Sequence, residues 1–205
     1  MKSKHFYSLL CDFKKKNPAV LLFWEGKFNL VIDFDWKDIL KFKFKTLTNN
    51  NVTQFSFKTL HRILPFRYNL FKWKIVNENF CIFCKRAEYF VHVLLECSKV
   101  TLFWKRIVEF ISSNFKEKVI LNEKLLIVGF DFKHSNAADI NIIIAYAQYA
   151  IYLMYMLNYF QGKTYNSYFI WHLFKYELLL DDISDVISKA LQTYTPVDIL
   201  QFKLL

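Results

Sequence analysis

The spacing of three cysteines and one histidine constrains this chain more than any other feature. Cys81, Cys84, His92 and Cys97 follow the pattern C-x2-C-x7-H-x4-C, and they include three of the chain's four cysteines. Zn²⁺ prefers four tetrahedral ligands of thiolate and imidazole, and a two-residue gap lets one tight turn present two sulfurs to one ion. The pattern therefore predicts a structural zinc site. A short helix over residues 88–95 would supply His92, with Cys97 just past its end.

A second interpretation of these residues needs no metal. In it, Cys81 and Cys84 are small buried residues and His92 is a histidine of the hydrophobic core. Cys11, alone near the start of the sequence, is expected to be a buried thiol. The x2 spacing, with no recognisable signal segment, favours a reducing compartment, so we expect an intracellular protein, nuclear or cytoplasmic.

Positive charge is concentrated around the cysteine pattern. Between Trp36 and Arg106 there are 14 Lys and Arg against 4 Asp and Glu, a balance of +10 that equals the net charge of the whole chain. Such a field attracts polyanions, and neutralising phosphates makes binding salt-dependent, although a charged run can also be a merely solvated face. We expect nucleic-acid contacts from seven cations: Lys58, Arg62, Arg67, Lys72, Lys74, Lys85 and Arg86.

Aromatic residues accompany these cations. If Tyr68, Trp73 or Phe83 is exposed, its ring can stack on unpaired bases; the alternative is that these rings belong to the core. Phe103 and Trp104 are assigned to the core outright.

The hydrophobic pattern predicts helices almost throughout, and three Gly and three Pro in 205 residues argue against a turn-rich β fold. We expect helices over 36–44, 53–64, 68–74, 100–114, 135–160, 168–180 and 183–191, with 123–130 a brief helix or strand. The helix over 53–64 should bury Phe57, Leu60 and Leu64.

The predicted fold is therefore mainly α: a small helical zinc-knuckle module of the CCHC type, followed by a helical tail bundle. It is divided into an N-terminal extension (1–33), a basic helical zinc-binding module (34–116) and a C-terminal helical tail (117–205).

The segment 140–160 allows another interpretation, because it has no formal charge and is long enough to cross a bilayer. It contains three amide side chains that are costly in hydrocarbon, at Asn141, Gln148 and Asn158. Its helical spacing also gathers Gln148, Tyr152, Tyr155 and Tyr159 on one side, which suits a packed helix that meets a partner or another helix. We therefore expect a soluble helix and keep a membrane-associated protein as an alternative.

Together these residues resemble a known family. The run Phe57-Lys58-Thr59-Leu60-His61-Arg62-Ile63-Leu64-Pro65, then Cys81-Ile82-Phe83-Cys84, Glu88, His92, Cys97 and Phe103-Trp104, is similar to the reverse-transcriptase zinc-binding domain of LINE-type retrotransposons, which lack long terminal repeats. The resemblance extends upstream to residues 34–39 and downstream to 125–130 and 147–152, and covers the chain from about residue 20. In the family's tail, basic residues often interrupt the long helix, whereas this chain has Gln148, Leu153 and Tyr155 there.

The resemblance implies a binding module that helps a retrotransposon polymerase hold template RNA or target DNA. Its expected partners are RNA or DNA, single-stranded or structured, and the upstream reverse-transcriptase domain. No catalysis is expected, since the paired acids Asp181 and Asp182 lack a polymerase palm around them and are expected to cap the last helix beside Ser184. The alternative function is a scaffold on which the polymerase docks.

Overall fold

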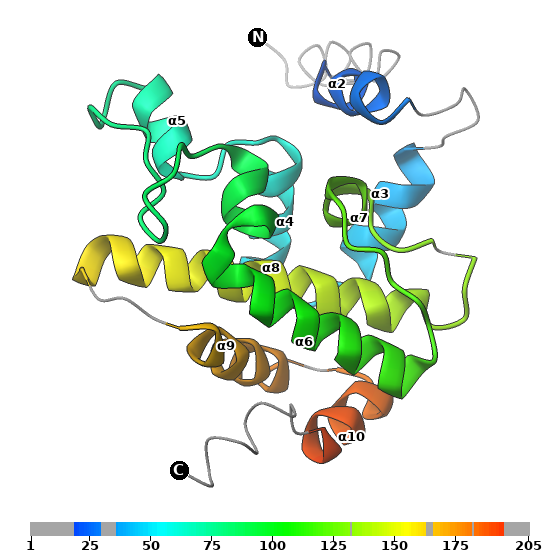
Figure 1. Ribbon diagram of the computed structural model, residues 1–205. Coiled ribbons are helices and arrows are strands. Elements are labelled where there is room, and N and C mark those ends of the chain that lie inside the picture. The colour runs from blue at the N-terminus through cyan, green and yellow to red at the C-terminus, as the bar shows by residue number, and fades with distance from the viewer. Residues whose placement is uncertain (1–18, 30–35, 132, 163–165, 182, 195–205) are drawn as a thin grey trace, which may run out of the picture. The chain divides into compact units, whose positions relative to one another are not determined.

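The computed structural model describes residues 19–29, 36–131, 133–162, 166–181 and 183–194, and most of these residues are helical (Figure 1). The described residues contain no strand, only an isolated bridge between Phe80 and Ala87, so the predicted mainly α fold is confirmed. The chain divides into two compact units, Met1–Asp38 and Ile39–Leu205. In the first, helix α2 (Ala19–Phe28) buries Trp24.

Three long helices form the centre of the second unit: α6 (Ser98–Phe115), α8 (Ala137–Gln161) and α9 (Ser167–Leu179). All three pack against one another. Helix α8 also packs against the shorter α4, so it lies between α4 and the pair α6 and α9 (Figure 1). Phe103 of α6 lies against Phe174 of α9, with ring centroids 6.1 Å apart, and Phe110 meets Trp171 at 6.0 Å. These four side chains are buried, as the sequence predicts for the α6 positions Phe103 and Phe110.

Helix α4 (Asn50–Leu60) begins three residues before the predicted start. The side chain of Asn49 accepts hydrogen bonds from the backbone N–H groups of Asn51 and Val52, and these bonds cap the helix. The prediction that Phe57 is buried is wrong, because 50% of this side chain is exposed. Val52, Phe55 and Leu60 form the buried apolar face of the helix instead.

Four shorter helices complete the described part of the second unit or cross into it: α3 (Trp36–Lys45), α5 (Arg67–Lys72), α7 (Glu123–Val128) and α10 (Asp185–Thr193). Lys43 of α3 is buried, and its Nζ donates to the carbonyl oxygens of Leu126 and Ile127 at 3.0 and 2.7 Å. Burial lowers the pKa of Lys43 to about 8. The lysine therefore holds the last carbonyls of α7 and ties that helix to α3.

Helix α8 is more evenly buried than its sequence pattern suggested. On the predicted polar side of this helix, Gln148 and Tyr155 are buried, Tyr152 is half-buried and Tyr159 is exposed. Gln148 Nε2 donates to Leu126 O at 3.1 Å. By length and composition alone α8 is apolar enough to cross a membrane, but 72% of its most apolar stretch is buried within the protein. That is the expected pattern for the core helix of a globular protein.

The loop before α8 depends on one glycine. Gly129 has a φ of +97°, and a Cβ atom there would lie 2.3 Å from Asn141 Oδ1. The same Asn141 amide bonds the backbone of Phe130 through both its oxygen and its nitrogen. Only glycine allows this close approach.

The last helix, α10, is capped by Ser184, whose Oγ accepts from Ile187 N. The carboxylate of Asp181 instead accepts hydrogen bonds from Thr48 Oγ1, at 2.7 Å, and from the Tyr146 hydroxyl. Asp181 thus joins the start of α4 to α8. The predictions for Cys11 and Asp182 fall outside the described residues.

Candidate metal centre and basic surface

The three cysteine sulfurs and one histidine nitrogen converge on a single point. The ligand atoms of Cys81, Cys84, His92 and Cys97 all lie within 4.8 Å of one another. The sulfurs of Cys81 and Cys97 are 3.9 Å apart, and Cys84 Sγ is 3.2 Å from His92 Nε2. Bonds of about 2.3 Å to sulfur and about 2.0 Å to nitrogen place tetrahedral ligand pairs roughly 3.5–3.8 Å apart. The cluster can therefore hold one metal ion.

The first two ligands sit on a closed turn. Lys85 N donates to Cys81 O at 2.9 Å, and Cys81 N donates to Arg86 O at 2.8 Å. Lys85 takes a φ of 62°, an uncommon conformation for a residue with a side chain. The turn thus presents two sulfurs close to each other.

The other two ligands are brought together by a wide turn, η2 (His92–Glu96). Cys97 N donates to His92 O at 2.7 Å, a bond between residues five apart. In an α-helix, residues five apart point about 140° away from each other. The i→i+5 winding of a π-turn reduces that angle, so His92 and Cys97 can face one ion. The helix predicted over 88–95 is present, but it begins at Phe90 and has this wider winding.

Cys97 also stands at the N-terminus of α6. It occupies the N-cap position of that helix. The hydrogen bond with Cys81 lowers the pKa of Cys97, whereas the same bond and burial raise the pKa of Cys81. Burial lowers the pKa of His92, which favours the neutral imidazole that binds metals. The pair therefore ionises first at Cys97, where the helix dipole favours negative charge.

A buried carboxylate joins residues 81–97, here called the metal segment, to the rest of the chain. Glu88 is 1% exposed and accepts hydrogen bonds from Tyr68 N at 3.0 Å and from the Tyr155 hydroxyl at 3.1 Å. Tyr155 in turn accepts from Arg67 N at 2.9 Å. Burial raises the pKa of Glu88 to about 7. These hydrogen bonds link α5 and α8 to the metal segment. In the sequence, Glu88 stood out only as an isolated acid between two pairs of ligands.

The seven predicted nucleic-acid contacts lie on the surface to different degrees. Five are exposed, Lys58, Lys72, Lys74, Lys85 and Arg86, while Arg62 and Arg67 are half-buried. Arg67 Nη2 is 3.6 Å from Glu78 Oε2, so part of its charge is already balanced. Residues 39–77 contain no Asp or Glu. Five cations are therefore free to face solvent in or near an acid-free stretch.

Of the three aromatic residues predicted to stack on bases, Trp73 is the most open, at 49% exposed. Phe83 is half-buried and packs edge-on against Tyr155, with ring centroids 5.4 Å apart. Tyr68 lies beneath Lys72, whose Nζ is 4.4 Å from the ring centroid. Trp73 is thus the ring of the three that has room for a base.

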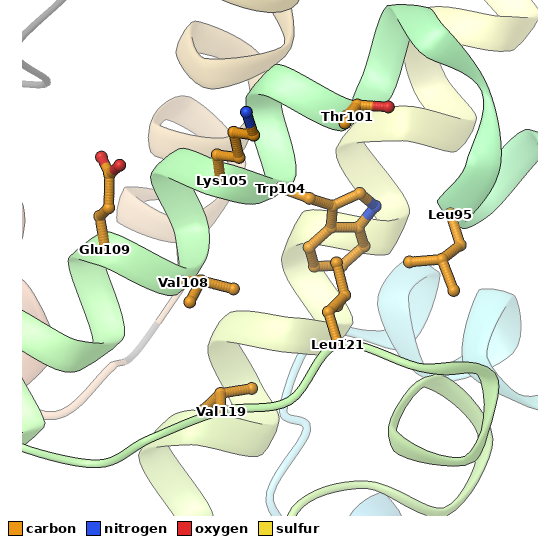
Figure 2. A pocket seen from close by; sticks show the side chains of 8 residues that line it. All are labelled: Leu95, Thr101, Trp104, Lys105, Val108, Glu109, Val119 and Leu121. Carbon is orange, nitrogen blue, oxygen red and sulfur yellow. The ribbon is translucent and has the colours of Figure 1, made fainter.

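An apolar groove of about 390 Å³ lies along α6, on the chain that follows the metal ligands (Figure 2). Figure 2 shows Leu95, Trp104 and Leu121 turned toward one another, while Lys105 and Glu109 point away from them. Trp104 is 2% exposed and its Nε1 donates to Leu94 O at 2.7 Å, so it is a core residue as predicted. The two rim charges are opposite, so the groove offers no net attraction to a polyanion.

Comparison of the chain with protein-family models, with curated proteins and with solved structures gives no match in any of the three. The resemblance to the reverse-transcriptase zinc-binding domain therefore stays a prediction from the motifs. What the geometry establishes is a helical chain with one Cys₃His cluster able to hold a metal ion.

Proposed function

We propose that this chain is a zinc-stabilised nucleic-acid-binding module of a LINE-type retrotransposon reverse transcriptase. In this role it positions template RNA or target DNA for the upstream polymerase and carries out no chemistry itself. The observation that supports the proposal is the convergence of Cys81, Cys84, His92 and Cys97 within 4.8 Å, in the most basic part of the chain.

Zinc is the metal that the donor set favours. Three thiolates and one imidazole are soft and borderline ligands, which suit Zn²⁺ and disfavour Mg²⁺ or Ca²⁺. Four protein ligands fill a tetrahedral shell, so no position is left for a reactive water. The metal's contribution is then to order residues 81–97, a segment with little regular structure of its own.

Once ordered, the segment presents cations in fixed places. Lys85 and Arg86 follow the second ligand directly, and Lys72 and Lys74 lie at the end of α5. Contacts between these side chains and phosphates give affinity without sequence choice. A stacked base on Trp73 would add preference for unpaired strands.

The first experiment measures bound zinc per chain by mass spectrometry after purification under reducing conditions. We expect one zinc per chain in the wild type and none in Cys81→Ser, with Ser98→Ala as a control that keeps the metal. A folded wild type without zinc would overturn the metal assignment.

The second experiment measures binding of a fluorescein-labelled single-stranded RNA by anisotropy between 50 and 200 mM salt. Each phosphate contact contributes about −0.7 to the slope of log K against log salt for single strands, so Lys85→Gln with Arg86→Gln should make the slope shallower by about 1.4. The control pair Lys118→Gln with Lys189→Gln removes two exposed cations elsewhere in the chain. It should change the slope much less than the Lys85 and Arg86 pair does. Affinity that is independent of salt would contradict nucleic-acid binding by these cations.

A docking scaffold for the polymerase is the second candidate, and the apolar groove on α6 favours it (Figure 2). The tyrosine-bearing side of α8 does not serve this role through Tyr155, which is buried inside the chain. If the groove is the docking surface, Val108→Glu should abolish association with the upstream polymerase domain and leave RNA affinity unchanged. Unchanged association would remove the groove from consideration.

A further inference from the structure

A second groove, of about 370 Å³, lies between α3 and α4, and it has an open aromatic ring on its wall. Its lining is Phe44, Thr53, Gln54, Phe57 and Lys58. Phe57 is 50% exposed, and its ring centroid is 4.2 Å from that of His61, with the planes tilted by 40°. A phenyl ring paired with an imidazole on one side and open on the other has a free face for a third planar group.

The charge around this groove has one sign. Its lining includes Lys58 and no carboxylate, and Lys41 and Lys45 on α3 are exposed. Asp181 reaches the start of α4, but the hydroxyls of Thr48 and Tyr146 already bind its carboxylate. The groove therefore attracts an anionic ligand that also carries an apolar surface.

A nucleotide combines these two properties within one residue, because its base has a π-face and its phosphate is negative. Phe57 and Lys58 both line the groove, so it offers a ring for the base and a cation for the phosphate. Gln54 adds an amide that can both donate to and accept from the edge of any base. Burial lowers the pKa of His61 below its usual value, so at neutral pH its ring is an uncharged stacking partner.

We propose that the groove between α3 and α4 is a stacking site for an unpaired nucleobase, with Phe57 as the platform and Lys58, Lys41 and Lys45 as its phosphate contacts. The proposal rests on the nucleic-acid-binding function proposed above and makes it more specific. A base inside a duplex cannot leave its stack without a cost, so this site selects single strands.

The test compares a labelled 12-nucleotide oligouridylate with a labelled duplex of equal length in anisotropy titrations. Phe57→Leu keeps an apolar side chain but removes the ring, and it should weaken binding of the single strand by about 5- to 100-fold with a smaller effect on the duplex. Phe160→Leu removes a more open ring at the end of α8, 74% exposed, and should change neither affinity.

A second variant reports the contact directly. In Phe57→Trp, the new indole should bind the single strand at least as well as phenylalanine does, and oligouridylate should quench its fluorescence. The wild type provides the baseline for the chain's five other tryptophans. Circular dichroism and bound zinc, measured for both variants, separate a binding defect from a folding defect.

Three outcomes would overturn the stacking site. Phe57→Leu could bind the single strand as tightly as the wild type while Lys85→Gln with Arg86→Gln binds it more weakly, which would leave the proposed function standing without this groove. Equal weakening of single strand and duplex would exclude base stacking. Wild-type protein that binds neither probe would overturn the proposed function and the stacking site together.

Discussion

The segment around the metal ligands and the helical core are held together by different forces. In that segment, residues 81–97, Lys85 has a φ of 62°, Tyr89 is 44% exposed, and helical winding is confined to residues 90–96. In the core formed by α6, α8 and α9, large side chains are fully buried. We expect a short segment with so little regular structure to depend on donor atoms around a cation, whereas burial of large side chains stabilises the core.

The two regions meet where Tyr155 of α8 contacts Glu88 of the metal segment, and where η2 packs against α6 with Trp104 Nε1 donating to Leu94 O. Apart from such contacts, the loss of one region should leave the other intact, and four changes test how far this independence extends.

Removing the metal should have the largest effect. Structural zinc contributes about 10–16 kcal/mol of binding free energy in zinc-finger peptides, so Cys81→Ser or a chelator should unfold the segment. We expect amides of residues 81–97 to lose protection in hydrogen-exchange mass spectrometry while those of α8 keep it. Equal loss of protection in α8 would show that the two regions fold as one.

Opening a cavity in the core should have the next largest effect. Phe174 is 0% exposed, and Phe174→Ala should lower the free energy of unfolding by about 3–5 kcal/mol in urea denaturation. Tyr176 on the same helix is 60% exposed, so Tyr176→Ala should cost about 0.5 kcal/mol or less. The folded Phe174→Ala protein should still bind one zinc, and loss of zinc before the core unfolds would contradict the comparison.

The contact between the regions should make stability depend on pH. The pKa of Glu88 is raised from 4.5 to about 7 in the folded chain, so between these values the folded state binds more protons than the unfolded state. The contribution of Glu88 to the free energy of unfolding should therefore fall by about 3 kcal/mol as the pH rises from 4.5 to 7.

Glu88→Gln keeps a hydrogen-bonding side chain but cannot titrate. The difference between wild type and Glu88→Gln, from urea curves at pH 5 and pH 7.5, isolates Glu88 because the metal ligands titrate in both proteins. A difference that does not change with pH would show that protonation of Glu88 does not contribute to the pH dependence of stability.

A helix cap in the tail should give the smallest of these effects. Ser184 Oγ accepts from Ile187 N and donates to Asp139 Oδ1 at 2.9 Å. Ser184→Ala should cost about 1 kcal/mol of unfolding free energy without changing the zinc content. Ser188→Ala, inside the same helix, serves as the control. An equal loss of unfolding free energy there would show that the cap hydrogen bond does not stabilise the protein.

The core helices could be predicted because their apolar residues repeat with helical spacing, as Phe103, Ile107 and Phe110 do in α6. The ligand set could be predicted because zinc dictates both residue type and spacing. Phe57 was misplaced because periodicity cannot tell a residue at the edge of an apolar stripe from one at its centre. The start of the helix was misplaced because the cap is Asn49, one of three adjacent asparagines.

Long-range polar contacts could not be predicted from the sequence. Lys43 looks like one more cation in a basic helix, yet its ammonium ends at two carbonyls more than 80 residues away. Glu88 and Tyr155 are 67 residues apart, and neither has a local pattern that names its partner. Such pairs depend on how helices dock, which is decided by the whole core and not by the residues near either group.

The wide turn over His92–Glu96 also bears on how the ligand spacing can vary. A π-turn accommodates one more residue than an α-turn, and in an α-helix residues four apart already lie about 40° from each other. Deleting Leu95 would shorten the interval between His92 and Cys97 by one and let an ordinary α-turn carry both ligands. A chain with H-x3-C in place of H-x4-C could thus close the same site, and deletion of one residue here need not abolish metal binding.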